Sequence, residues 1–346
     1  MKRASLFLCL VALSVTACGS QAVISSPARP SPASPSTGPT RTVASTVSLA
    51  PTADQPADRS VEVSRRARAH IESLTSIGPR VAGSQAEGQA AAYISIALGA
   101  LGYQPQIRPF VATSWSHRQI TSANVVAVKP GASPRQIVVG AHYDSVSKGL
   151  GADDNASGVA VMLEVAELLA DEFTPYTVCF VAFGAEEVGF LGSAAFVAGM
   201  SEEERANTLL MVNLDSVVAG NFQYVYSEEG SSAARDWVLT WASAHGRDLR
   251  TVHDIVFNDP HGNGFSDYAP FLAAGIPFVY FEATDWTLGD KDGWTQVDTT
   301  LADRGVIRHT GYDTLAWLDA TFPGRVDARL ELTVAALYAF LTTYEE

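Results

Sequence analysis

From Val61 to the C-terminus, compact apolar runs alternate with stretches in which apolar residues recur every three or four positions. The recurring stretches predict helices over 61–77, 86–101, 159–169, 233–244 and 330–341, with a short helix that begins near Ser266. The compact runs predict strands over 104–111, 122–128, 136–140, 177–183, 209–214, 222–226, 250–256 and 278–282. This alternation is typical of an α/β fold. Because no internal repeat or long gap interrupts it, we predict one folded domain over 61–346.

The first residues follow a different pattern. The chain starts with Met1-Lys-Arg, continues with a largely apolar run, and reaches the small-residue sequence Val15-Thr-Ala-Cys18. A basic start, a short apolar core and a small-residue cleavage site are typical of an export signal. Because the end of this segment resembles a bacterial lipobox, we predict a lipoprotein signal peptide over 1–17 and lipid modification of Cys18.

Residues 18–60 are rich in Ser, Pro and Thr and contain few large apolar side chains. Such a segment cannot bury enough surface to offset its chain entropy, so we predict a disordered tether. Together with the signal, the tether predicts an exported protein that is lipid-anchored at the membrane surface of a bacterial cell envelope. Secretion is the alternative location. We expect membrane contact only through the N-terminal lipid anchor.

Composition narrows the possible partners. The chain has 346 residues, 47% of them hydrophobic, and a formal net charge of −14, which argues against nucleic acid as a partner. Of the three cysteines, Cys9 lies in the predicted signal, Cys18 is the predicted lipidation site, and Cys179 lies inside an apolar strand. No disulfide is therefore expected, despite the oxidising location.

Polar clusters follow three of the predicted strands, and a fourth cluster forms a glycine-bounded turn. The clusters are His142-Tyr-Asp144, Gly151-Ala-Asp-Asp154-Asn-Ala-Ser-Gly158, Glu186-Glu187 and Asp215. In an open α/β sheet, ligands bind at the carboxyl ends of the strands. Carboxylate oxygen and imidazole nitrogen together form a donor set that zinc accepts. The pattern predicts a metal site and, by itself, metal-assisted hydrolysis.

This ordered set, completed by His309-Thr, resembles the co-catalytic di-zinc aminopeptidases, peptidase family twenty-eight, from Val61 to the C-terminus. The resemblance implies a three-layer α/β/α fold with a mixed, mostly parallel central sheet, the phosphorylase/hydrolase-like fold of zinc peptidases. It also implies two Zn²⁺ ions as cofactors. The implied substrates are the N-termini of peptides or proteins.

The resemblance also implies a role for each polar residue. It assigns five zinc ligands. His142 and Asp215 bind one ion, Glu187 and His309 bind the other, and Asp154 bridges the two. Glu186 becomes the general base, which takes a proton from water and returns it to the leaving amine. Asp144 orients His142, and Asp313 supports the region around His309. Gly264-Phe-Ser-Asp267 is implied to lie near the substrate.

Two positions depart from the family pattern. Arg308 stands where many members carry tyrosine or another hydrophobic residue, and Tyr268 stands where many carry histidine. Both positions bear on how substrate is held, and neither removes a zinc ligand. The long polar stretch 284–308 is expected to border the site. We interpret its acids as a solvated rim, with a preference for basic N-terminal residues as the alternative: Asp285, Asp290, Asp292 and Asp298.

Three other functions fit parts of the pattern. A carboxypeptidase or dipeptidase of related metal architecture would use the same donors on a different substrate. A glutaminyl cyclase, an acyltransferase on the same scaffold, usually binds one zinc and typically lacks the paired Asp153-Asp154. A non-catalytic surface lipoprotein is expected to have lost ligands, whereas all five are present here.

Overall fold

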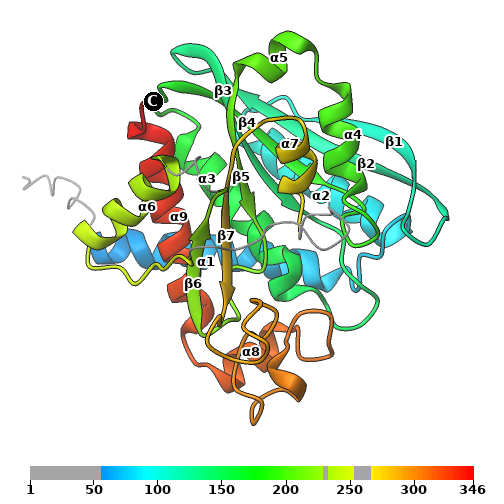
Figure 1. The fold of residues 1–346 in the computed structure, drawn as a ribbon, viewed down its shortest axis with the longest axis vertical. Helices are drawn as coiled ribbons and strands as arrows, with labels where there is room; N and C mark the ends of the chain where they lie inside the picture. The colour runs from blue at the N-terminus through cyan, green and yellow to red at the C-terminus, as the bar shows by residue number, and fades with distance from the viewer. Residues whose placement is uncertain (1–55, 229–232, 253–265) are drawn as a thin grey trace, which may run out of the picture. The chain divides into compact units, whose positions relative to one another are not determined.

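A seven-stranded sheet organises the part of the chain that the computed structural model describes, residues 56–228, 233–252 and 266–346 (Figure 1). The strand order is β1-β2-β4-β3-β5-β7-β6. The strands are β1 (Gln106–Thr113), β2 (Gln119–Lys129), β3 (Ser133–His142), β4 (Tyr176–Phe183), β5 (Thr208–Leu214), β6 (Phe222–Tyr226) and β7 (Phe278–Thr284). The predicted signal peptide and Cys18 lie outside the described residues.

The four central strands β4, β3, β5 and β7 are parallel, while β1, β2 and β6 pair in antiparallel fashion at the flanks. Every residue of β5 and β7 is buried, as expected for parallel strands that are covered on both faces. Along β3, Ile137 and Val139 join one core, whereas Val138 joins the other. Because parallel strands end at the same edge, residues that follow β3, β4 and β5 are brought together.

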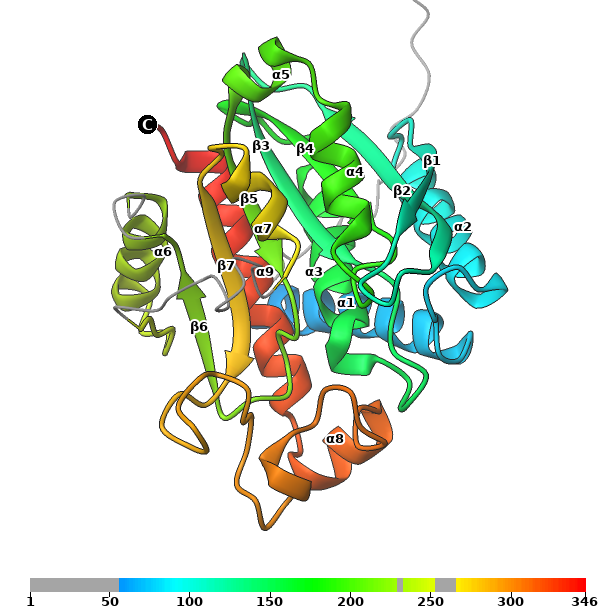
Figure 2. The same ribbon diagram turned by 45° about the vertical axis from the view of Figure 1, so that its right-hand side comes forward.

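Helices cover both faces of this sheet. They are α1 (Pro56–Ser76), α2 (Gln85–Ala100), α3 (Gly158–Leu169), α4 (Leu191–Gly199), α5 (Glu202–Asn207), α6 (Ala233–Ala244), α7 (Tyr268–Ala273), α8 (Leu315–Thr321) and α9 (Arg325–Thr343). Figure 2 shows α4 and α7 in front of the sheet, and α1, α3 and α9 behind it. The predicted three-layer α/β/α fold with a mixed sheet is therefore confirmed. None of the helices in the described ranges is long and apolar enough to cross a bilayer.

Some element boundaries differ from the predictions. Helix α1 begins at Pro56, five residues before the predicted start, because proline is favoured in the first turn of a helix. Ser60, at the end of the predicted tether, donates a hydrogen bond to Glu331 of α9 at 2.8 Å. In the predicted strand 250–256, Arg250 forms only an isolated bridge with Tyr224, and residues from 253 onward lie outside the described residues. The short helices α4, α5 and α8 were not predicted.

Candidate metal centre

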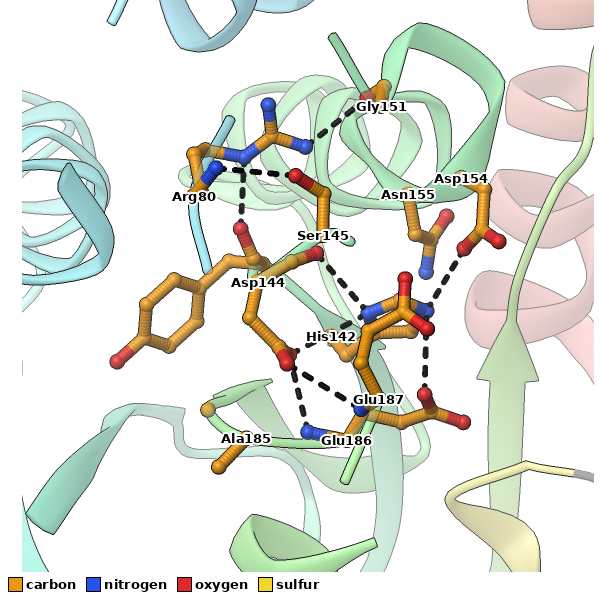
Figure 3. Close-up of polar contacts among 12 residues, drawn as sticks. Arg80, His142, Asp144, Ser145, Gly151, Asp154, Asn155, Ala185, Glu186 and Glu187 are labelled. Carbon is orange, nitrogen blue, oxygen red and sulfur yellow. Dashed lines mark hydrogen bonds and ion pairs between the residues drawn. The ribbon is translucent and has the colours of Figure 1, made fainter. Parts of the chain in front are cut away.

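The carboxyl ends of β3, β4 and β5 bring the predicted site residues to one edge of the sheet (Figure 3). His142 is the last residue of β3, with 1% of its surface exposed. Glu186 and Glu187 lie in the loop that follows β4, and Asp215 directly follows β5. Asp154 lies in the kinked turn Ala152–Ser157 that leads into α3, and its own backbone is not helical.

The two carboxylate oxygens of Asp154 face different histidines. Its Oδ1 lies 3.2 Å from His142 Nε2, and its Oδ2 lies 3.2 Å from His309 Nε2. Each histidine also contacts a second carboxylate. His142 Nε2 is 3.5 Å from Asp215 Oδ1, and His309 Nε2 is 2.8 Å from Glu187 Oε2. The five predicted ligands therefore form two groups that share Asp154.

These distances fit a metal ion. A tetrahedral zinc ion with ligand bonds of about 2.0–2.1 Å separates its donor atoms by about 3.3 Å. The four contacts above span 2.8–3.5 Å. Donor atoms of His142, Asp154 and Glu187 all lie within 4.8 Å of one another, and so do those of His142, Glu186 and Asp215. The donor chemistry and the spacing both fit zinc.

Glu186 borders the donor set. Its Oε2 lies 3.9 Å from His142 Nε2, and 7% of the residue is exposed. By distance alone, Glu186 is close enough to join His142 and Asp215 as a metal ligand. Its contact with His142 is longer than the corresponding contacts of Asp154 and Asp215. This arrangement leaves Glu186 beside the donors that surround the candidate metal position.

The pKa values indicate that the cluster is short of positive charge. Burial, together with the charge of Asp154, raises the pKa of Glu187 to about 7. Burial alone would lower the pKa of His309, but its bonds to Asp154 and Glu187 raise that pKa to about 10. The pKa of His142 is also raised, because the charges of Glu186 and Asp215 outweigh its burial. Bound protons or a metal cation can offset the excess negative charge.

Buried carboxylates outside the donor set hold the loops that carry it. Asp144 accepts hydrogen bonds from the backbone amides of Glu186 at 3.0 Å and Glu187 at 3.2 Å. Its Oδ1 also lies 3.5 Å from His142 Nδ1. Asp144 therefore lies beside His142, as predicted, and additionally fixes the loop after β4.

Asp313 performs the same kind of task at the turn before α3. Its carboxylate accepts from the backbone amides of Asp153 at 2.6 Å and Asp154 at 3.2 Å. Asp313 was predicted to support the region around His309, and its hydrogen bonds go to the turn that carries Asp154. This contact joins residues about 160 positions apart in the chain.

Four supporting residues were missed by the sequence analysis: Arg80, Glu87, Asp153 and Gln296. Glu87 accepts from the Ala185 amide at 3.0 Å, just before Glu186. Asp153 accepts from the amides of Val218 and Ala219, both at 2.9 Å, and from Gln296 Nε2 at 2.7 Å. The only sequence signal was the adjacency of Asp153 to Asp154. For the other three, no local pattern marks a buried role.

The two departures from the family pattern have different surroundings. Arg308 is 8% exposed, and its Nη2 donates to Glu282 Oε1 at 2.6 Å. Its guanidinium carbon lies 5.4 Å from the ring centre of Trp294, whose ring also packs edge-on against His309. Tyr268 is fully buried and stacks on Phe278 in the core. Arg308 therefore lies beside the candidate site, while Tyr268 packs in a core cluster with Phe278 and Tyr280.

Two further segments were predicted to lie at the site, residues 264–267 and 284–308, and the described residues place only part of each there. Ser266 donates to Asp215 Oδ2 at 2.8 Å, so the end of the predicted Gly264–Asp267 segment reaches the site. Gly264 and Phe265 lie outside the described residues. Within the stretch 284–308, Asp285 is buried and accepts from Asn221 at 2.8 Å. The prediction of a solvated rim is therefore wrong for Asp285. The other three acids named in that prediction are exposed: Asp290, Asp292 and Asp298.

Comparison with known proteins identifies the family of the chain. The sequence model of Peptidase family M28 matches residues 124–333. The alkaline phosphatase isozyme conversion protein of Escherichia coli strain K12 is 35% identical over 280 residues, which are 72% of this chain and 81% of that protein. The Mycobacterium tuberculosis protein named probable lipoprotein aminopeptidase LpqL is 31% identical over 180 residues. That match covers 47% of this chain and only 34% of the relative.

Solved structures share the fold. The zinc aminopeptidase BSAP from Bacillus subtilis superposes with a TM-score of 0.66 at 21% identity, over 82% of this chain and 96% of that chain. A glutaminyl cyclase from Porphyromonas gingivalis gives 0.62 at 19% identity, over 80% and 97%. The fold therefore occurs in both enzyme classes. The family match over more than half of the sequence, together with the Escherichia coli relative, shows that the chain belongs to peptidase family M28.

Proposed function

We propose that the chain is an aminopeptidase that hydrolyses the N-terminal peptide bond of peptides with two zinc ions. One ion would be held by His142, Asp215 and Asp154, and the other by Glu187, His309 and Asp154. The observation that carries this proposal is the placement of Asp154, whose two oxygens each face a different histidine at 3.2 Å. A carboxylate in this position can serve two metal ions at once.

The residues around the ions would divide the chemistry between them. Bound zinc would supply Lewis acidity toward a water molecule and the scissile carbonyl. Glu186 would take a proton from the water and deliver it to the leaving amine. Burial raises the pKa of Glu186 well above its usual value, which suits a carboxylate that must hold a proton for part of the cycle. Asp144 would keep Glu186 in place through its backbone amide.

The charge around the site favours a free amine as the substrate group. Buried carboxylates outnumber the histidines, and a peptide N-terminus is a cation that such a cluster attracts. Glutaminyl cyclisation is the second candidate, because a solved cyclase shares the fold. The complete five-ligand set favours hydrolysis, since it offers donors for two ions, whereas a glutaminyl cyclase usually binds one.

A panel of chromogenic aminoacyl amides tests the proposal. The chain without residues 1–17 would be assayed on free and N-acetylated versions of each amide, with and without chelator. We expect chelator-sensitive turnover of the free-amine set alone. If N-terminal glutaminyl peptides cyclise instead, the acyltransferase is correct. Turnover of only N-blocked peptides, from their carboxyl ends, would identify a carboxypeptidase.

The location of the protein belongs to the same proposal. We infer an exported protein that is anchored through lipid on Cys18, with residues 18–55 as a tether. The Mycobacterium tuberculosis relative is named a probable lipoprotein aminopeptidase, which supports this inference. Cell fractionation checks it, because Cys18→Ser is expected to move the protein from the membrane to the soluble fraction.

A further inference from the structure

Arg80 is fully buried, and its guanidinium donates to three backbone carbonyls. Figure 3 shows the bond to Gly151. It lies just after α1, beyond the helix-breaking pair Gly78-Pro79. Nε donates to the Tyr143 carbonyl at 2.8 Å, Nη1 to Leu150 at 2.8 Å, and Nη2 to Gly151 at 2.9 Å. Each of the three guanidinium nitrogens thus donates to the same stretch of backbone, residues 143–151.

That stretch connects two predicted zinc ligands. Tyr143 directly follows His142, and Gly151 begins the turn that carries Asp154. The intervening residues 146–149 are half-buried or exposed. Arg80 therefore connects the two ends of the surface loop 146–149, where the chain leaves the site after His142 and returns to it before Asp154.

The backbone of Arg80 strengthens the same connection. Its amide donates to Ser145 Oγ at 3.0 Å, and its carbonyl accepts from the Ser145 amide at 3.2 Å. Gly151 fits closely against the guanidinium, because a Cβ at this position would lie 2.8 Å from Arg80 Nη2. The hydrogen bonds to Ser145 and the close packing at Gly151 together hold Arg80 in one position against this loop.

We propose that Arg80 is a positioning residue of the metal centre, which sets zinc affinity by fixing the spacing between the loops of His142 and Asp154. This inference rests on the proposed function, in which those two residues bind zinc. Arginine suits the task because its planar fork presents several donors at fixed angles, whereas lysine offers a single ammonium group. Partners outside the ligand set commonly change metal affinity by about 10- to 100-fold.

A competing explanation is that Arg80 only balances charge. Among the described residues its hydrogen-bond acceptors are neutral carbonyls and no carboxylate, yet Asp313 and Asp144 lie near enough to act on it through space. The two explanations predict opposite outcomes. Removing a nearby positive charge should tighten the binding of a cation, whereas loosening the two loops should weaken it.

Arg80→Lys and Arg80→Met separate these explanations when zinc affinity and stoichiometry are measured by calorimetry on the full mature chain. Arg80→Lys keeps the charge and loses the fork. We expect both variants to bind zinc about 10- to 100-fold more weakly than the unmodified chain. Zinc binding by Arg80→Lys at unmodified strength, or tighter binding by Arg80→Met, would overturn the positioning role.

Arg66→Met is the matched control. Arg66 pairs with the buried Glu164 between α1 and α3, with Nε 3.1 Å from Glu164 Oε2. Its other ion pairs among the described residues go to Glu62 and Glu167, which lie outside the predicted site. Its loss should lower the thermal unfolding midpoint of the zinc-free protein without changing zinc affinity. An equal loss of zinc affinity in Arg66→Met and Arg80→Lys would mean that general destabilisation is the cause, which contradicts the inference. An unmodified chain that binds no zinc would overturn the proposed function and the inference together.

Discussion

Glu186 and Asp154 contact the same histidine, but at different distances. Asp154 lies 3.2 Å from His142 Nε2, whereas Glu186 lies 3.9 Å away. We therefore expect Glu186→Gln to retain zinc and to lose turnover by about 10²- to 10⁴-fold, because a carboxamide cannot accept the proton. Calorimetry and steady-state kinetics on one preparation check both parts. Substantial residual turnover would show that another group is the base.

Asp154→Asn is expected to lose zinc, in contrast to Glu186→Gln, which is expected to keep it. The carboxamide keeps the shape of the side chain but replaces one acceptor oxygen with a donor that cannot ligate zinc. One proposed metal position should lose its ligand and the other should keep only a neutral amide oxygen, so we expect zinc stoichiometry to fall along with turnover. Metal analysis after dialysis measures this directly. Retention of two ions by Asp154→Asn would contradict the bridging assignment.

At the scale of elements, α4 approaches the end of β4 so closely that only glycine fits at Gly192. A Cβ there would overlap the Gly184 carbonyl and lie 2.5 Å from Asn124 Oδ1. Gly192→Ala should therefore displace α4 or the loop that leads to Glu186. We expect the free energy of unfolding to fall by about 1–3 kcal/mol and turnover to fall with it.

Gly199→Ala, in the last turn of the same helix, is the control for this prediction. Nothing lies within 4 Å of a Cβ at Gly199, so the substitution should leave stability unchanged or slightly higher. Urea unfolding and kinetics of the two variants isolate the effect of close packing from that of helix propensity. Equal behaviour of both variants would show that the approach of α4 does not position the loop.

At the scale of the whole molecule, zinc and protons compete for the same cluster. Metal-free His309 has a pKa of about 10, above the value near 6.5 expected in the unfolded chain. Between these values the native state holds a proton that the unfolded state has lost. Raising the pH from 7 to 8.5 should therefore lower the stability of the metal-free protein.

Zinc should reverse this trend, because its ligands must be deprotonated and its affinity rises with pH. Thermal unfolding with chelator and with zinc, at pH 7 and pH 8.5, measures the difference. We expect the stabilisation by zinc to increase at the higher pH. If the stabilisation by zinc were smaller at pH 8.5 than at pH 7, zinc would not be displacing protons from the histidines.

The sequence predicted what depends on local pattern. His142, Glu186 and Asp215 could be located because each follows an apolar run that is long enough to be a strand, and parallel strands end together. Gln296 could not be located, since its role depends on contact with Asp153, 143 positions away. Arg80 was missed for the same reason, because an arginine after a helix is normally expected in solvent.

Two supports of the site lie outside the stretch that the family model matches. That match covers residues 124–333, whereas Arg80 and Glu87 come before it. A chimera that exchanged only the matched stretch between relatives would transfer the donor side chains together with Asp144, Asp153 and Asp313, but without Arg80 and Glu87. The smallest transferable unit of this enzyme therefore starts upstream of Arg80, and engineering that respects only the similarity boundary should yield folded proteins with poorly organised sites.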